Sequence, residues 1–366
     1  MSMSTISLPS SINDWIKEIQ PDIAAAIHYG LEFLGQARSP QGQWRDFCLA
    51  PGLSDEWVTG YVGAAVAEIN DSLAWNMAFQ AWRWLSQRQS EGGWGYNVLV
   101  PRDADSTIWA LQLAQSLGCG DWAPSRRARA WLRHHVQKNK GIATYTPESP
   151  IREFIQASKT DSLAGWTQSH VCVTAAAAQL APFRLEACDF LRTRQEADGR
   201  WASYWWCEDE YATSLAASAL VSVGNLGDGD RIYQAMQWGQ HQVQANGAVV
   251  TMTCPEGSSF ATALVLYLLA TVSLTDEHKD NDHRFDAIVK IVRWLLEHQQ
   301  LDGSWSSSAA LRVPPPNVLS PESVQDWILS GKIKKAIVLD QQNIFTTATV
   351  LKSVCQLQRA MNRFTH

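Results

Sequence analysis

The chain has 366 residues, of which 46% are apolar, with a formal net charge of −6 and a sequence pI of about 5.9. This length allows one large domain or two medium ones, and the acidic balance argues against a nucleic-acid-binding surface. The unusual count is 18 tryptophans, because tryptophan at this density is typical of a repeat core or an apolar cavity.

The cysteines and the apolar runs indicate the compartment. The seven cysteines stand far apart without a CxxC pair, which favours buried free thiols in a reducing cytoplasm. The Ser-rich start lacks the basic and apolar stretches of a signal peptide. The longest apolar run, 260–274, is shorter than the ~20 residues that a bilayer span needs. We therefore expect a protein that is at most peripheral to a membrane.

One motif recurs along the chain with a spacing of about 50 residues, enough for two helices and two loops. It combines an aromatic–Leu pair, a Gln and a Gly-x-Trp turn. The turns stand at 42–44, 92–94, 199–201 and 303–305, and decayed copies stand at 141–143 and 247–249. We expect the glycine to allow a tight turn and the indole to cover the end of the preceding helix.

A second pattern follows each turn. A five-residue segment begins with Asp, Ser, Asn or Gly, as a helix N-cap would, and ends with a hydroxyl residue. These segments are 55–59, 103–107, 165–169, 209–213, 258–262 and 343–347. Each continues into small apolar sequence, typical of a helix buried on most sides, whereas the other helix of each unit is amphipathic. The alternation predicts an all-α fold, a single closed (α/α)6 toroid over residues 21–366 with inner and outer helices.

Two segments interrupt this rhythm, 139–163 and 306–342, and both are rich in proline. Connections of this length are typically lids or binding loops. Because both precede inner helices, we expect them at the same mouth of the toroid, with 306–342 as a lid insertion. Residues 1–20 are expected to form an N-terminal extension that packs outside the ring.

The third residues of the six segments should meet at the mouth. They are Trp57, Asp105, Thr167, Tyr211, Phe260 and Phe345, with Tyr61 and Trp109 one turn deeper. The pattern predicts an aromatic-lined cavity with one acid at its rim, and a collapsed hydrophobic core is the alternative. A lone carboxyl in such a place is costly unless it is protonated or paired. His170, on the neighbouring helix, is the expected partner of Asp105.

These residues carry a family resemblance. The Gln and Gly-x-Trp turns resemble the repeats of the squalene–hopene and oxidosqualene cyclases. Segment 103–107, Asp-Ala-Asp-Ser-Thr, resembles the Asp-x-Asp-Asp-Thr signature of class II terpene cyclases. Segment 169–171, Ser-His-Val, resembles the part of squalene–hopene cyclases whose His hydrogen-bonds the acid. The chain has length for one toroid instead of the usual two, and so is similar to single-domain bacterial enzymes that cyclise the prenyl chains of meroterpenoids.

The resemblance implies a protonation-initiated cyclase without a cofactor or metal. Its substrate would be a linear isoprenoid chain, carried on an aromatic acid head group, that becomes a polycyclic meroterpenoid. Asp105 would donate the proton, and Asp103 and His170 would polarise it. The family's fourth motif residue is Asp, and here it is Ser106, which can relay a hydrogen bond but brings no charge.

The chemistry requires an acid without competing water, and an apolar site keeps a carboxyl neutral. Aromatic faces stabilise a carbocation by about 0.5–2 kcal/mol each. The candidates for this role are Trp57, Tyr61, Trp109, Trp166, Tyr211, Phe260 and Phe345. Glu208, Glu210 or water are the candidates for the base that ends the reaction.

Other functions remain open on the sequence. A zinc-dependent prenyltransferase would share the toroid, and Cys207, Asp209 and His170 are the nearest metal-ligand trio. A carbohydrate-active toroid would need paired acids, which Glu208 and Glu210 could supply. A non-catalytic isoprenoid-binding protein is the remaining alternative.

Overall fold

The computed structural model describes residues 12–272, 281–329 and 335–362. Its inner helices form a closed ring, because each packs against the next and the last, α14, packs against the first, α2. They are α2 (Glu56–Ala67), α4 (Ala104–Ser116), α8 (Val171–Ala177), α10 (Asp209–Val223), α12 (Ser259–Leu269) and α14 (Ile344–Asn362). All but one residue of α2, all of α12 and 11 of the 15 residues of α10 are buried, as expected for helices with apolar surface all round.

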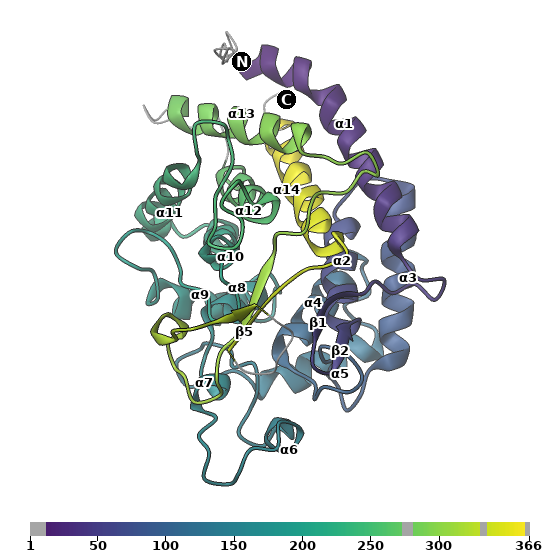
Figure 1. Cartoon of the computed structure of the whole chain (residues 1–366), viewed down its shortest axis with the longest axis vertical. Coiled ribbons are helices and arrows are strands. Elements are labelled where there is room, and N and C mark those ends of the chain that lie inside the picture. The colour runs from purple at the N-terminus through teal and green to yellow at the C-terminus, as the bar shows by residue number, and fades with distance from the viewer. Residues whose placement is uncertain (1–11, 273–280, 330–334, 363–366) are drawn as a thin grey trace.

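The outer helices alternate with the inner ones and bury one face each, which completes the predicted all-α (α/α)6 toroid (Figure 1). They are α1 (Ile12–Ala37), α3 (Ser72–Arg88), α5 (Ala123–Arg133), α9 (Arg184–Arg192), α11 (Gly229–Gln242) and α13 (Asn281–Glu297). Residues 12–20 are not a separate extension, since they form the first part of α1. Trp15 there packs edge-on against Phe285 of α13, with ring centroids 5.4 Å apart. The remaining residues of that expected extension, 1–11, lie outside the described residues.

One hydrogen bond recurs in all six units. The hydroxyl oxygen of an inner-helix threonine accepts the backbone N–H of the turn residue that precedes the helix, at 2.8 to 3.1 Å. The pairs are Thr59 with Trp44, Thr107 with Trp94, Thr174 with Ile142, Thr213 with Trp201, Thr262 with Val249, and Thr347 with Trp305. This bond fixes the turn to the helix that follows it.

The third unit corrects the sequence alignment. Its threonine is Thr174, and α8 begins after His170, five residues later than the pattern 165–169 predicted. Residues Ala164–Thr167 form a separate short helix, α7. Ser169 does not anchor the turn, because its hydroxyl bonds the side chain of Asn139 instead. The position equivalent to Asp105 is therefore Cys172, and Thr167 is not part of the ring.

Irregular segments cover the N-terminal ends of the inner helices. They contain the hairpin of β1 (Asp46–Leu49) and β2 (Gly52–Ser54), the short helix α6 (Ile151–Phe154), and the 3-10 turn Pro321–Ser323. A second sheet has the order β3-β5-β4, in which β3 (Ala310–Val313) runs antiparallel to β5 (Ala336–Leu339) and β4 (Ile328–Leu329) runs parallel to it. Another 3-10 turn, Leu226–Asp228, lies between α10 and α11. Figure 1 shows β5 crossing in front of the inner helices.

The two long connections meet at this mouth, as predicted. The backbone N–H of Gly165 donates to the carbonyl of Pro316 at 2.8 Å, and the Trp166 indole donates to the carbonyl of Pro314 at 2.9 Å. Within the described ranges, none of the helices is both long enough and apolar enough to cross a bilayer.

Candidate active site

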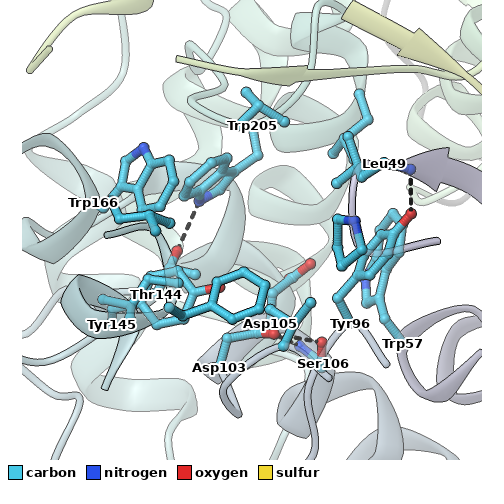
Figure 2. Close-up of a pocket in the computed structure, with 17 residues that line it drawn as sticks. Leu49, Trp57, Tyr96, Asp103, Asp105, Ser106, Thr144, Tyr145, Trp166 and Trp205 are labelled. Carbon is cyan, nitrogen blue, oxygen red and sulfur yellow. Dashed lines mark hydrogen bonds between the residues drawn. The ribbon is translucent and has the colours of Figure 1, made fainter. Parts of the chain in front are cut away.

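A cavity of about 120 Å³ lies between the inner-helix ends and the mouth segments (Figure 2). Its walls come from the β1–β2 hairpin, the loop before α4, the connection 144–155, α7 and β3. The lining is apolar and aromatic apart from Asp103, Asp105, Ser106 and Thr144. Both predicted lid segments therefore contribute to one site, and Asp105 faces it.

Asp103 is the N-cap of α4. One carboxylate oxygen accepts the backbone N–H of Ser106 and the other accepts its hydroxyl, each at 2.8 Å. Burial raises the pKa of Asp103 to about 7, and the two donors from Ser106 oppose that shift. Ser106 therefore acts on Asp103, where it favours the ionised form, and both of its hydrogen bonds go to Asp103 instead of Asp105.

Asp105 sits in the first turn of α4 and is partly exposed, to the cavity. Burial, followed by the neighbouring charge of Asp103, raises the pKa of Asp105 to about 8. The indole N–H of Trp57 faces this carboxyl and opposes the shift, although it makes no hydrogen bond of full geometry. Asp105 is consequently a neutral carboxylic acid at pH 7 in an apolar cavity, as an alkene-protonating acid must be.

His170 does not pair with Asp105, which corrects the expected contact. Its Nδ1 atom is 2.7 Å from the Thr144 hydroxyl and its Nε2 atom is 2.7 Å from the Gly165 carbonyl. Both ring nitrogens are thereby used. Burial lowers the pKa of His170 to about 4, so the ring is neutral. It cannot polarise the acid by charge at neutral pH.

The four aromatic third residues pack together at the centre of the ring, but most of them do not line the cavity. Trp57 and Phe345 lie 5.1 Å apart between ring centroids, Phe260 and Phe345 lie 6.0 Å apart, and Tyr211 and Phe260 lie 6.4 Å apart. The indole of Trp206 packs onto all of them. Of these four aromatic residues only Trp57 reaches the cavity, so the collapsed-core alternative holds for the centre of the ring.

The deeper aromatics form a second, much smaller pocket below. Tyr61, Trp109 and Tyr211 line it, and the Trp109 indole donates to the Tyr211 hydroxyl at 3.2 Å. Thr167 takes no part, because its hydroxyl bonds the Leu163 carbonyl of its own short helix at 3.1 Å. Of the predicted binding residues, Trp57 and Trp166 are the ones that line the cavity.

Several lining residues were not predicted from the sequence. They include Tyr96, Thr144, Tyr145 and Trp205, all on connecting segments (Figure 2). The adjacent pair Trp205-Trp206 was the available signal, because two consecutive tryptophans before an inner helix occur in no other unit. Helix periodicity says nothing about how such a loop folds over the ring.

Buried acids elsewhere do not reach the cavity. Glu208 is 2% exposed, and one of its oxygens accepts the Ala310 N–H at 3.3 Å while the other has no partner among the described residues. Burial raises the pKa of Glu210 to about 7. Neither side chain is among the groups that line the cavity, so neither is placed to take a proton from a bound cation.

The zinc alternative has no matching geometry. Asp209 accepts the backbone N–H of Ser203 at 2.8 Å and pairs with Arg200 at 2.9 Å, and His170 is fully engaged. Across the residues that the structure describes, no three His, Cys, Asp or Glu side chains are grouped to hold a metal ion.

Comparison with solved structures identifies the family. The type II terpene cyclase MstE from Scytonema, as a variant bound to its product merosterolic acid A, is 38% identical over 94% of this chain and 99% of its own, with a TM-score of 0.89. Another MstE variant, bound to its substrate geranylgeranyl dihydroxybenzoate, is 37% identical over 93% and 98%, with a TM-score of 0.85. A protein from Actinoplanes is 34% identical over 92% and 99%, with a TM-score of 0.84.

The chain belongs to the type II terpene cyclases. It is an enzyme that cyclises isoprenoid chains through carbocations, which overturns the zinc-prenyltransferase and non-catalytic alternatives. A heparin-specific unsaturated glucuronyl hydrolase, 11% identical with a TM-score of 0.58, shares only the fold. Family sequence models give no match to the chain. Curated protein sequences give none either.

Proposed function

We propose that this cyclase converts a linear prenyl chain on an aromatic acid into a polycyclic meroterpenoid, with Asp105 as the proton donor. The observation that carries the proposal is a neutral carboxyl at the wall of an apolar, aromatic cavity. The substrate class is supported by MstE, whose solved complexes hold geranylgeranyl dihydroxybenzoate and merosterolic acid A.

The reaction begins when the Asp105 O–H transfers its proton to one carbon of the terminal double bond. A C–H bond forms, and the other carbon becomes a tertiary cation that successive double bonds attack. Trp57, Trp166 and Trp205 present aromatic surface to the same cavity and would stabilise that charge. When a carbon next to the final cation loses a proton to water and a double bond forms, the product is an isomer of the substrate. Asp105 then regains a proton from solvent.

Asp103 has a distinct role in this scheme. Its charge lies next to the Asp105 carboxylate that each turnover creates, and disfavours that anion. The same repulsion makes Asp105 the stronger proton acceptor when it is reset. The two donors from Ser106 oppose the effect of burial on the pKa of Asp103 and so favour the ionised form that this role requires.

The head group needs a place near the cavity where its carboxylate can meet a basic side chain. Arg312 is held by the carbonyls of Ser203 and Tyr204 and pairs with Glu322, so it is not free to take a carboxylate. Arg152 is beside the cavity on α6, with its guanidinium bonded to the carbonyls of Ser158 and Asp161. Lys332 and Lys334 lie outside the described residues. Because Arg152 stands between the lining residues Ile151 and Phe154, we place the acid group towards α6.

The test is cyclisation in D2O. Purified enzyme is offered geranylgeranyl dihydroxybenzoate and, separately, geranylgeranyl diphosphate, and products are separated by chromatography and identified by NMR. The expected product from the first substrate carries one deuterium, added at the carbon that Asp105 protonates. Asp105→Asn is expected to bind the substrate and give no product. Cyclisation by that variant, or turnover of the diphosphate alone, contradicts the proposal.

A peripheral membrane contact also belongs to this proposal. Leu53, Val98 and Leu99 are 37%, 70% and 65% exposed and flank the cavity-lining residues Pro51 and Val100. This apolar rim would let a lipophilic substrate pass from a bilayer into the cavity. Cosedimentation with neutral phosphatidylcholine vesicles is expected for the wild type and reduced for a variant with Val98 and Leu99 both changed to Ser. Equal cosedimentation of the two proteins contradicts it.

A further inference from the structure

Trp206 fills the centre of the toroid mouth. Its side chain is 1% exposed, and it contacts aromatic residues from four of the inner helices. Its ring centroid lies 5.9 Å from Trp57, 4.7 Å from Tyr211, 5.1 Å from Phe260 and 5.3 Å from Phe345. Phe47 of β1 also packs against Trp206, with ring centroids 6.1 Å apart.

The backbone that carries this indole is hydrogen-bonded to β3, in the sheet of β3, β5 and β4. Trp206 forms an antiparallel bridge with Leu311 of β3. On either side, the Cys207 N–H donates to the Ala310 carbonyl at 2.9 Å, and the Arg312 N–H donates to the Trp205 carbonyl at 2.8 Å. The indole thus enters the ring from the mouth, on residues 205–207, which are hydrogen-bonded to β3.

Extended backbone sends consecutive side chains to opposite sides. Trp205 lines the cavity, and Trp206 points the other way, into the bore (the space enclosed by the inner helices). The Trp206 indole does not itself line the cavity. It lies directly behind the lining residue Trp57, and it packs on Tyr211, Phe260 and Phe345 on its other sides. A smaller side chain at position 206 would leave space between the cavity wall at Trp57 and those three side chains.

We infer that Trp206 is a specificity-determining residue that limits the depth of the substrate cavity and so the length of prenyl chain that the enzyme cyclises. This inference rests on the proposed function. The volume of the cavity, about 120 Å³, is small beside the roughly 300–1,000 Å³ of ligand pockets. A side chain smaller than Trp206 adds room at the end of the cavity that lies over the bore.

The test compares chain lengths in competition. Wild type, Trp206→Phe, Trp206→Leu and Trp206→Ala are each offered equal amounts of dihydroxybenzoates that bear three, four or five isoprene units. We expect the ratio of kcat/KM for the longer chain over the shorter to rise by roughly tenfold in the Leu and Ala variants, since added methylenes change a hydrophobic pocket's preference by such factors. The Phe variant should stay near the wild-type ratio.

The matched control is Trp82→Leu. Trp82 is also fully buried, but it lies on outer helix α3 and packs on Trp94, with ring centroids 6.0 Å apart. The Trp82→Leu substitution removes the same side-chain volume as Trp206→Leu, but it does so on an outer helix and not in the bore. Its chain-length ratio should equal that of the wild type. If Trp206→Ala fails to fold, Trp206→Leu and Trp206→Phe still provide the comparison.

Two results would overturn the inference. One is an unchanged chain-length ratio in a folded Trp206→Leu variant. The other is a uniform loss of rate for all chain lengths, which would make Trp206 a cation-facing residue instead of a boundary. Failure of the proposed function looks different, because then the wild type itself cyclises none of the three substrates.

Discussion

The Nε2 atom of His170 lies 2.7 Å from the carbonyl oxygen of Gly165, and its Nδ1 atom lies 2.7 Å from the Thr144 hydroxyl. A carbonyl only accepts, so Nε2 carries the proton and Nδ1 accepts from Thr144. The Thr144 oxygen accepts in turn from the Trp205 indole at 2.7 Å (Figure 2). His170 therefore orients a wall of the cavity instead of the acid.

This relay predicts an effect on products. Thr144→Val removes the atom that joins Trp205 to His170, so the indole loses its fixed orientation and the cation meets a different surface. We expect the mixture of cyclised products to broaden, while deuterium uptake from D2O shows that protonation continues. Thr144→Ser keeps the hydroxyl and should restore the wild-type mixture. An unchanged mixture in Thr144→Val would show that the relay does not shape the reaction.

The protonation state of Asp105 should determine how the rate depends on pH. Burial and Asp103 raise the pKa of Asp105 to about 8, and only the protonated form can initiate cyclisation. We expect kcat/KM to be level near neutral pH and to fall about tenfold per pH unit above 8. The measurement is the initial rate at substrate concentrations well below KM, taken across a range of pH in overlapping buffers. A fall that begins near pH 4 would mean that Asp105 is already ionised at neutral pH and is not the donor.

The same raised pKa predicts a stability effect of opposite sense to the usual one for a carboxyl. Between an unfolded value near 3.9 and the folded value of about 8, the folded state binds more protons at Asp105 than the unfolded state does. Its stabilising contribution is complete below this window and is lost as the pH rises through it. The Asp105→Asn variant cannot ionise at this position, so it does not lose this stability as the pH rises. The Tm of the variant should gain on the wild-type Tm from pH 5 to pH 9, and a constant difference would contradict the raised pKa.

The repeated threonine bond predicts a structural cost away from the cavity. In the fourth unit the Trp201 N–H donates to the Thr213 hydroxyl at 2.9 Å, and both residues are fully buried. Thr213→Val leaves that N–H without a partner, which should lower the free energy of unfolding by about 1–3 kcal/mol. Thr213→Ser, which keeps the hydroxyl, should cost less. Denaturant unfolding of the pair measures the difference.

The fold could be predicted because the repeat records it twice, in the Gly-x-Trp turns and in the threonines that bond them. The third unit was misaligned because it combines a lost tryptophan with a long connection between its turn and its helix, so neither feature marks where the helix begins. There the Nδ1 atom of His135 lies 3.0 Å from the Ala143 carbonyl, and Ser169 imitates the hydroxyl position in sequence alone. The predicted start of the third inner helix is therefore five residues too early, which puts Thr167 on the ring in place of Cys172.

The site was predicted only in part for a related reason. Asp103 and Asp105 belong to an inner helix, whose register the repeat determines, and both line the cavity. Trp205, Trp206 and Thr144 belong to connecting segments that have no equivalent in other units. Their positions depend on tertiary bonds, such as that between Arg312 and the Trp205 carbonyl, which no sequence periodicity reports.

The hydrogen bonds of Gln299 have a topological consequence. Its side-chain amide donates to the carbonyls of Gly303 in its own turn and Ala26 in α1, both at 2.9 Å. Gln195 makes the same two bonds, to Gly199 and to Arg231 of the next outer helix. The contact between α13 and α1, where the ring closes, therefore has the same hydrogen bonds as the contact between α9 and α11 inside the chain. A circularly permuted gene that links α14 to α1 and opens the chain at the turn before α11 should encode the same ring.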